Sequence, residues 1–320
     1  MNEIGRKIVD KLIELYGSAD FKIAFLPYKR SMWNSMESVY EECKTSGIDA
    51  HCMPIPYIRM KEGHQGDYLD TDKFLFGDIA EPVECLDDLN PDFIAIHYQY
   101  EDKNRVTNML PKYFTKALKD RYNCKIVYLP YGIGSGKGGF AIQPGCRYVD
   151  YAFLEDQNNA DRFIAAWLTQ GVNFSGRVFA FGSPKFDAAH KTIEKIVPDE
   201  WADIIKDKSV TLIVNSLGAY LSNPYQRIIL YTQAAKNEIN IGNAVIFRPH
   251  PLLRTTIKSM RPETGWRYEQ MCREFKELGV IVDESEYLER AMSAADILVS
   301  DPSSVLAMWR DTGKPWRELV

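Results

Sequence analysis

Short apolar runs alternate along the chain with longer segments in which apolar residues recur every three or four positions. Residues 22–27 (KIAFLP) and 50–55 have the length of strands, and residues 33–44 between them have the spacing of a helix. Parallel strands need a crossover connection, which is usually a helix, so this order indicates a parallel pair. The pattern predicts an α/β fold.

The alternation falls into two series. In the first we expect a helix over residues 106–122 and strands over 93–97, 125–129, 151–154 and 178–181. In the second we expect strands over residues 210–214, 244–247, 280–282 and 296–299. Residues 183–203 contain two prolines and two charge clusters and are the predicted hinge. We therefore expect two Rossmann-like domains, residues 1–190 and 191–320, facing across a cleft.

The sequence contains neither a membrane-spanning segment nor a secretory signal. No apolar run approaches the roughly 18 residues of a membrane span. Residues 1–17 carry Glu3, Asp10 and Glu14, which a secretory signal would lack, and they have the pattern of an amphipathic helix. The six cysteines form no C-x-x-C pair, which favours reduced thiols, and the five histidines lack metal-ligand spacing. We expect a cytoplasmic protein without a bound metal or cofactor.

Composition narrows the class of partner. Of 320 residues, 45% are hydrophobic and 26% are charged, which is typical of a folded globular chain. The 39 basic and 44 acidic residues leave a net charge of −5, so no overall field attracts a nucleic-acid backbone. Seven basic residues lie between residues 103 and 125. Such a run is usually a solvated face, and its alternative is contact with anionic lipid or a polyanionic acceptor.

Ligands of open α/β sheets bind beyond the carboxyl ends of the strands, so the residues directly after each strand are the candidates for a binding site. Arg248 and His250 follow the strand at 244–247 within Arg-Pro-His-Pro. Arginine suits phosphate because it donates two parallel hydrogen bonds, and histidine exchanges protons near neutral pH. The alternative is that His250 only braces a proline turn.

Two further segments follow strands of the predicted sheets. Asp301, Ser303 and Ser304 lie where the strand at 296–299 leads into a helix, and they either bind an anion or cap that helix. Gly182 and Lys185 follow the strand at 178–181, where Lys185 either meets a phosphate or is solvated. We also expect Asp187 to cap the following helix.

The first series contributes its own candidates. His97 ends the strand at 93–97 and Tyr98 follows it, and His97 is as consistent with a structural role as with a catalytic one. The glycine run at 132–139 includes Lys137 but lacks the residues of a Walker A loop. It is either a surface loop or a cleft loop that meets a charged ligand.

The segments Gly182-Ser-Pro-Lys-Phe-Asp187, Arg248-Pro-His-Pro251 and 296–305 resemble, in order and spacing, the CDP-glycerol glycerophosphotransferases of teichoic acid synthesis. The resemblance covers most of the chain after about residue 125. It implies a GT-B-like fold and a CDP-polyol donor held by the second half. It also implies a membrane-associated acceptor that approaches the first half, at the inner face of the membrane. It also implies functional roles for His250, Ser303 and Ser304.

Two departures from the family pattern affect the expected activity. Tyr131-Gly132 stands where the family has His-Gly, so the usual base is absent and Tyr131 or His97 is the remaining candidate on the acceptor side, with Tyr98 and Lys137. The chain ends at Val320, where family members continue into a further strand and closing helices. We therefore expect an incomplete donor domain.

The leading hypothesis is transfer of a polyol phosphate from a CDP-linked donor to a hydroxyl of a lipid-linked cell-wall or capsule polymer or glycan, with release of CMP. Arg248, Ser303, Ser304, Asp301, Lys185 and Gly182 would form the donor phosphate site, and His250 would act at the pyrophosphate. Two alternatives remain. One is a nucleotide-sugar glycosyltransferase of the same fold, and the other is a catalytically idle binding or scaffold protein.

Overall fold

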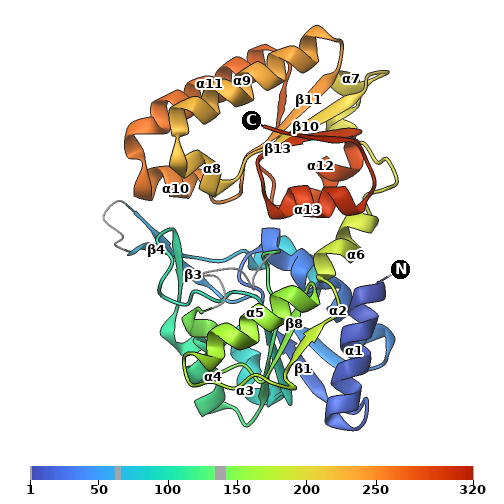
Figure 1. Ribbon diagram of the computed structural model, residues 1–320, viewed down its shortest axis with the longest axis vertical. Coiled ribbons are helices and arrows are strands. Elements are labelled where there is room, and N and C mark those ends of the chain that lie inside the picture. Colours follow the sequence, from blue (N-terminus) through green and yellow to red (C-terminus); the bar gives the residue numbers. More distant parts are fainter. Residues whose placement is uncertain (1, 62–65, 134–141, 320) are drawn as a thin grey trace. The chain divides into compact units, whose positions relative to one another are not determined.

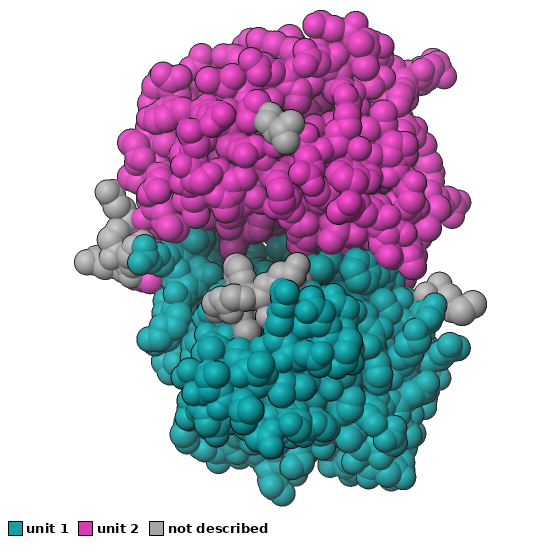
Figure 2. All heavy atoms as spheres, viewed as in Figure 1, with its two compact units in different colours: residues 1–59, 67–188 teal, residues 60–66, 189–320 magenta. Residues whose placement is uncertain are grey.

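The computed structural model describes residues 2–61, 66–133 and 142–319, and the chain divides into two compact units (Figure 2). Unit 1 comprises residues 1–59 and 67–188, and unit 2 comprises residues 60–66 and 189–320. Each unit is built on one parallel sheet with helices packed against it (Figure 1). The α/β fold with two Rossmann-like sheets is therefore confirmed.

The main sheet of unit 1 has the order β2-β1-β5-β7-β8-β9, and all of its neighbouring strands run parallel. Its strands are β1 (Lys22–Phe25), β2 (Asp49–Cys52), β5 (Phe93–Ile96), β7 (Lys125–Tyr128), β8 (Tyr151–Leu154) and β9 (Val178–Ala180). A second sheet, which the sequence pattern did not predict, contains β3 (Tyr57–Met60), β4 (Gly66–Asp70) and β6 (Thr107–Met109). The strand order changes direction between β1 and β5, which is where open sheets of this kind bind ligands.

The helices of the first series are α1 (Glu3–Tyr16), α2 (Glu37–Thr45), α3 (Leu86–Leu89), α4 (Thr115–Arg121), α5 (Gln157–Leu168) and α6 (Pro184–His190). Short 3-10 turns occur at Arg30–Ser35, Lys73–Ile79, Val83–Cys85, Pro111–Tyr113 and Pro144–Cys146. The predicted helix over residues 106–122 is correct only for its last part, α4, because the residues before it form β6 and a 3-10 turn. Pro111 lacks an N–H and keeps Leu110 extended, with ψ of 139°.

The core of unit 1 forms where α1 and α2 pack against the sheet. Ile8, Val9 and Leu12 of α1 are buried with Phe25 of β1 and Trp33. The predicted amphipathic N-terminal helix is thus confirmed. Its first turn is held by Asp187 of α6, whose carboxylate accepts from the N–H groups of Ile4 (3.1 Å) and Gly5 (2.8 Å). The expectation that Asp187 caps the helix following it is wrong, because that residue lies inside α6.

Unit 2 contains a sheet of order β12-β11-β10-β13-β14, again parallel throughout. Its strands are β10 (Val210–Val214), β11 (Ala244–Arg248), β12 (Ile281–Val282), β13 (Ile297–Ser300) and β14 (Trp316–Glu318). Its helices are α7 (Ala202–Ile205), α8 (Leu217–Ser222), α9 (Pro224–Asn240), α10 (Leu253–Met260), α11 (Gly265–Glu277), α12 (Leu288–Ala294) and α13 (Ser304–Asp311), with 3-10 turns at Asp199–Trp201 and Pro262–Thr264. The sequence pattern did not predict β14.

Strand register in unit 2 brings three turns to one level. Val214, the last residue of β10, pairs with Arg248 on one side and with Ser300 on the other. The segments that follow β10, β11 and β13 therefore start together at the carboxyl edge of the sheet. The change of strand order between β10 and β13 falls at the same place.

Candidate functional site

Two hydrogen bonds join the three turns of unit 2. The backbone N–H of His250 donates to Oδ1 of Asn215, at 2.7 Å, and links the turn after β11 to the turn after β10. The backbone N–H of Ser216 donates to Oδ2 of Asp301, at 2.9 Å, and links the turn after β10 to the turn after β13. His250 and Asp301, predicted from separate segments, thus belong to one connected edge.

The start of α13 presents unpaired amide groups. Oγ of Ser303 accepts from the N–H of Leu306, at 3.2 Å, so Ser303 caps the helix. Its hydroxyl lies 3.3 Å from Oγ of Ser300, which already donates to the carbonyl of Asp301, so the Ser303 proton points to Ser300. Among the described residues, the N–H groups of Ser304 and Val305 have no partner. These amides and the Ser304 hydroxyl are the groups best placed to bind an anion.

His250 has a defined protonation pattern on this edge. Its Nδ1 accepts from the N–H of Leu252, at 3.1 Å. A neutral imidazole that accepts at one nitrogen carries its proton at the other, so Nε2 is the donor. In the neutral ring Nε2 is therefore a hydrogen-bond donor and not an acceptor.

Arg248 is engaged within the protein. Its guanidinium forms an ion pair with Asp283 and donates to the carbonyl of Ser285, at 2.8 Å, and its side chain is 3% exposed. The arginine joins β11 to the segment after β12 and shapes the turn that carries His250. A phosphate would have to replace Asp283 to contact Nη1.

Asp301 is an acceptor at the centre of the edge and is not itself suited to bind phosphate. Its carboxylate accepts from Arg227 (3.0 Å) and Tyr231 (2.6 Å) as well as from Ser216, and its side chain is fully buried. Burial and the Asp301 charge raise the pKa of Tyr231, so that hydroxyl stays a donor. Asp301 fixes the position of the turn before Ser303.

His97 of unit 1 lies at the change of strand order between β1 and β5, fully buried. Its Nε2 accepts from the N–H of Tyr28, at 2.8 Å, so the proton is on Nδ1, which lies 3.1 Å from Oγ of Ser35. The Ser35 hydroxyl itself donates to the carbonyl of Met32. Burial lowers the pKa of His97 to about 3. Both ring nitrogens are occupied, which favours the structural alternative for this residue.

Aromatic side chains fill the same edge of unit 1. Tyr98 stacks on Tyr28 with ring centres 3.9 Å apart, and its hydroxyl donates to the carbonyl of Thr107, at 2.8 Å. Tyr131 is half-buried beside Tyr98 and Tyr100, and burial raises its pKa well above the usual tyrosine value. At neutral pH the Tyr131 hydroxyl is therefore protonated and is no base.

The remaining predicted residues of unit 1 have internal contacts or lie outside the described residues. Nζ of Lys185 is buried and donates to the carbonyl of Tyr131, at 2.8 Å. Gly182 has φ of +102°, and a Cβ there would stand 2.7 Å from Ile4 of α1, so both the conformation and the packing need glycine. Lys137 and most of the glycine run lie outside the described residues.

The basic run at 103–125 is largely neutralised. Lys116 pairs with Asp120, Lys119 with Asp150, and Arg121 with Asp87. These pairs favour the solvated-face interpretation of the run over a dedicated anion surface. No helix in the described part of the chain has the length and apolar character needed to cross a bilayer.

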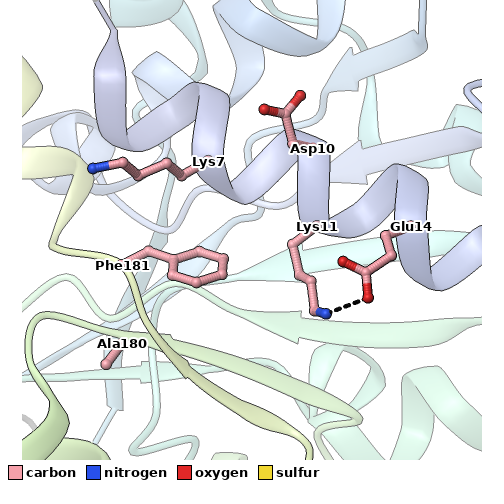
Figure 3. Close-up of a pocket in the computed structure, with 6 residues that line it drawn as sticks. All are labelled: Lys7, Asp10, Lys11, Glu14, Ala180 and Phe181. Carbon is pink, nitrogen blue, oxygen red and sulfur yellow. Dashed lines mark hydrogen bonds and ion pairs between the residues drawn. The ribbon is translucent and has the colours of Figure 1, made fainter.

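An open hollow of about 470 Å³ lies between α1 and the end of β9 (Figure 3). Lys7 and Lys11 extend from α1 on the side of Phe181. Each lysine is already paired one turn away, Lys7 with Glu3 and Lys11 with Glu14, both at 2.6 Å. The hollow therefore offers little uncompensated charge. Across the described ranges, no cluster of three or more His, Cys, Asp or Glu side chains is placed to hold a metal ion.

The location rule would have found two residues that the sequence analysis missed. Asn215 and Ser216 follow the predicted strand at 210–214 directly. Asp283 and Ser285 could not be found in this way, because their role depends on the contact that β11 makes with β12.

The two Rossmann-like sheets define a GT-B-like fold, and solved structures share it. UDP-GlcNAc 2-epimerase from Methanocaldococcus jannaschii aligns with a TM-score of 0.59 and 14% identity, over 93% of this chain and 83% of that one. S. aureus MnaA, solved with UDP, aligns at 0.58 and 13%, over 92% and 78%. The wall teichoic acid polymerase TagF aligns at 0.49 and 13%, over 92% and 69%. No protein-family model and no curated protein matches the chain.

Proposed function

We propose that the protein transfers a polyol phosphate, glycerol phosphate foremost, from a CDP-linked donor to a hydroxyl of an anionic envelope polymer. The observation that carries the proposal is the edge of unit 2. The unpaired amides of Ser304 and Val305 follow β13 and His250 follows β11, and hydrogen bonds link both turns to the turn after β10, the strand between them. The resemblance of the segments at 182–187, 248–251 and 296–305 supports a CDP-polyol donor over other nucleotides.

In the proposed reaction, the acceptor oxygen attacks the β-phosphorus of the donor. A new P–O bond forms to the acceptor, the P–O bond to CMP breaks, and the acceptor proton passes to solvent. The amides of Ser304 and Val305 stabilise charge on the phosphate oxygens, and His250 donates a hydrogen bond from Nε2 to the departing CMP oxygen, which leaves as the CMP phosphate anion. Phosphoryl transfer through a loose transition state depends mainly on positioning and charge stabilisation, so the absence of a histidine at Tyr131 is compatible with turnover.

The test is calorimetric titration with CDP-glycerol, CDP-ribitol and a UDP-sugar. The variant Ser303→Asp keeps a good helix cap but places a negative charge at the start of α13. We expect it to abolish binding of CDP-glycerol without unfolding the protein. Asn223→Asp makes the same change at the cap of α9, where Asn223 accepts from Gln226, and serves as the matched control.

Three outcomes decide the donor class. Binding of CDP-polyols that is lost in Ser303→Asp and kept in Asn223→Asp supports the proposal. Binding of the UDP-sugar alone would contradict it and favour the glycosyltransferase alternative. Donor binding with no transfer to any polyol-phosphate acceptor would favour the idle binding protein.

A further inference from the structure

An arginine on the surface of unit 2 lies between two exposed aromatic rings. The Arg267 guanidinium is 5.1 Å from the ring centre of Tyr225 and 4.8 Å from that of Trp266. Tyr225 is 44% exposed and Trp266 is 60% exposed. Among the described residues no carboxylate pairs with Arg267, and Glu263, one turn earlier, makes no ion pair with it. The rings hold the guanidinium in place without neutralising it.

A second arginine adds charge to the same surface. Arg261 donates only to backbone carbonyls, those of Met260 (2.9 Å) and Leu221 (3.4 Å), within the described chain. The hydroxyls of Tyr220 and Thr264, 3.0 Å apart, join α8 to the turn before α11. Tyr225, Arg261, Trp266 and Arg267 together form what we call the aromatic-arginine surface.

This surface belongs to the edge of unit 2 that carries the proposed donor site. Helices α9 and α11 run back along the sheet, so both begin at the carboxyl ends of the strands. Arg227, two residues after Tyr225 in α9, reaches Asp301 at 3.0 Å. A molecule that contacts Arg267 is thus held at the same carboxyl edge of the sheet as the start of α13.

We propose that the aromatic-arginine surface binds the acceptor as a phosphodiester-linked polyol chain, away from the hydroxyl that reacts. This inference rests on the proposed function. Arg267 donates two parallel hydrogen bonds to a phosphodiester, and the free ring faces of Trp266 and Tyr225 pack on the C–H groups of the polyol between phosphates.

Two other occupants fit the surface less well. A lipid surface needs a continuous apolar face, whereas the exposed positions of α9 after Ile229 are Gln233, Lys236, Asn237 and Asn240. A nucleic acid needs an extended cationic surface, and the chain has a net charge of −5.

The test uses fluorescently labelled poly(glycerol phosphate) of about ten units and anisotropy at several salt concentrations. We expect Arg267→Gln to weaken binding at least tenfold and to reduce the slope against log salt by about one, as for loss of one phosphate contact. Arg273 is an exposed arginine of the same helix that makes no ring or ion-pair contact with any described residue, and Arg273→Gln should stay within twofold of wild type. Trp266→Ala removes an exposed ring that is not part of the core, and it tests how much that ring contributes to polymer binding.

Equal polymer affinity of wild type and Arg267→Gln would overturn the inference, as would Arg267-dependent binding of oligo-dT or of phosphatidylglycerol vesicles in preference to the polymer. CDP-glycerol titrated into the same wild-type protein separates the two claims. If the protein binds CDP-glycerol and its affinity for the polymer does not depend on Arg267, the aromatic-arginine surface is not the acceptor site and the proposed function still stands. Arg267-dependent polymer binding without donor binding would reject the proposed transferase and leave a polyanion-binding site.

Discussion

The side-chain oxygen of Asn215 accepts a hydrogen bond from the backbone N–H of His250 at 2.7 Å, which couples the ends of β10 and β11. Nδ2 of Asn215, a side chain 1% exposed, has no hydrogen-bond partner among the described residues. Asn215 is therefore a positioning residue for the turn that presents the imidazole.

Replacing Asn215 with alanine should leave the His250 N–H without its acceptor. We expect the free energy of unfolding to fall by about 1–2 kcal/mol, partly offset by removal of the unpaired amide. Urea denaturation measures the loss, and Asn237→Ala, at an exposed position of α9, is the control. An unchanged midpoint in Asn215→Ala would show that this hydrogen bond does not hold the turn.

His97 predicts a pH dependence of stability. Its folded pKa of about 3 lies below the unfolded value of about 6.5, so unfolding takes up a proton between these limits. The stabilisation is complete above about pH 6.5 and is lost by about 1.4 kcal/mol per unit as the pH falls toward 3.

His97→Gln keeps an acceptor for Tyr28 and a donor for Ser35 but does not titrate. Its unfolding free energy should depend less steeply on pH between 6 and 4 than that of wild type. His190→Gln, which removes a histidine paired with Asp311 at the surface, is the control. Parallel curves for His97→Gln and wild type would mean that the buried imidazole is not the group responsible.

The buried pair of Arg248 and Asp283 predicts a strong effect of single substitution. Arg248→Leu leaves Asp283 buried without its counter-charge, so we expect a loss of about 3–5 kcal/mol. Adding Asp283→Leu should restore part of that loss because the second change removes the uncompensated charge. Guanidinium denaturation of both variants measures this coupling. An Arg248→Leu variant as stable as wild type would show that the ion pair with Asp283 does not stabilise the fold.

The stacked tyrosines Tyr28 and Tyr98 predict opposite effects of the same substitution. The buried hydroxyl of Tyr28 has no partner in the described chain, so Tyr28→Phe should be neutral or stabilising. Tyr98→Phe removes the donor to the Thr107 carbonyl and should cost about 1 kcal/mol. Thermal unfolding of the two variants compares them directly, and equal losses would contradict the assigned hydrogen bonds.

Strand and helix periodicity predicted both parallel sheets, because apolar runs of strand length are explicit in the sequence. It did not predict β6, since residues 106–122 have helical spacing and only Pro111 marks the interruption. The rule that ligands bind at the carboxyl ends of strands placed Arg248, His250 and Asp301 on one edge. Contacts between distant segments could not be predicted. The ion pair of Asp283 with Arg248 is one, and the hydrogen bond that the Asp187 carboxylate accepts from the first turn of α1 is another.

A crystal structure of the protein with bound CDP tests the central claim most directly. We predict the diphosphate at the start of α13, with oxygens within hydrogen-bond distance of the Ser304 and Val305 amides and of Nε2 of His250. A nucleotide bound elsewhere, with these amides and the imidazole free of it, would contradict the account.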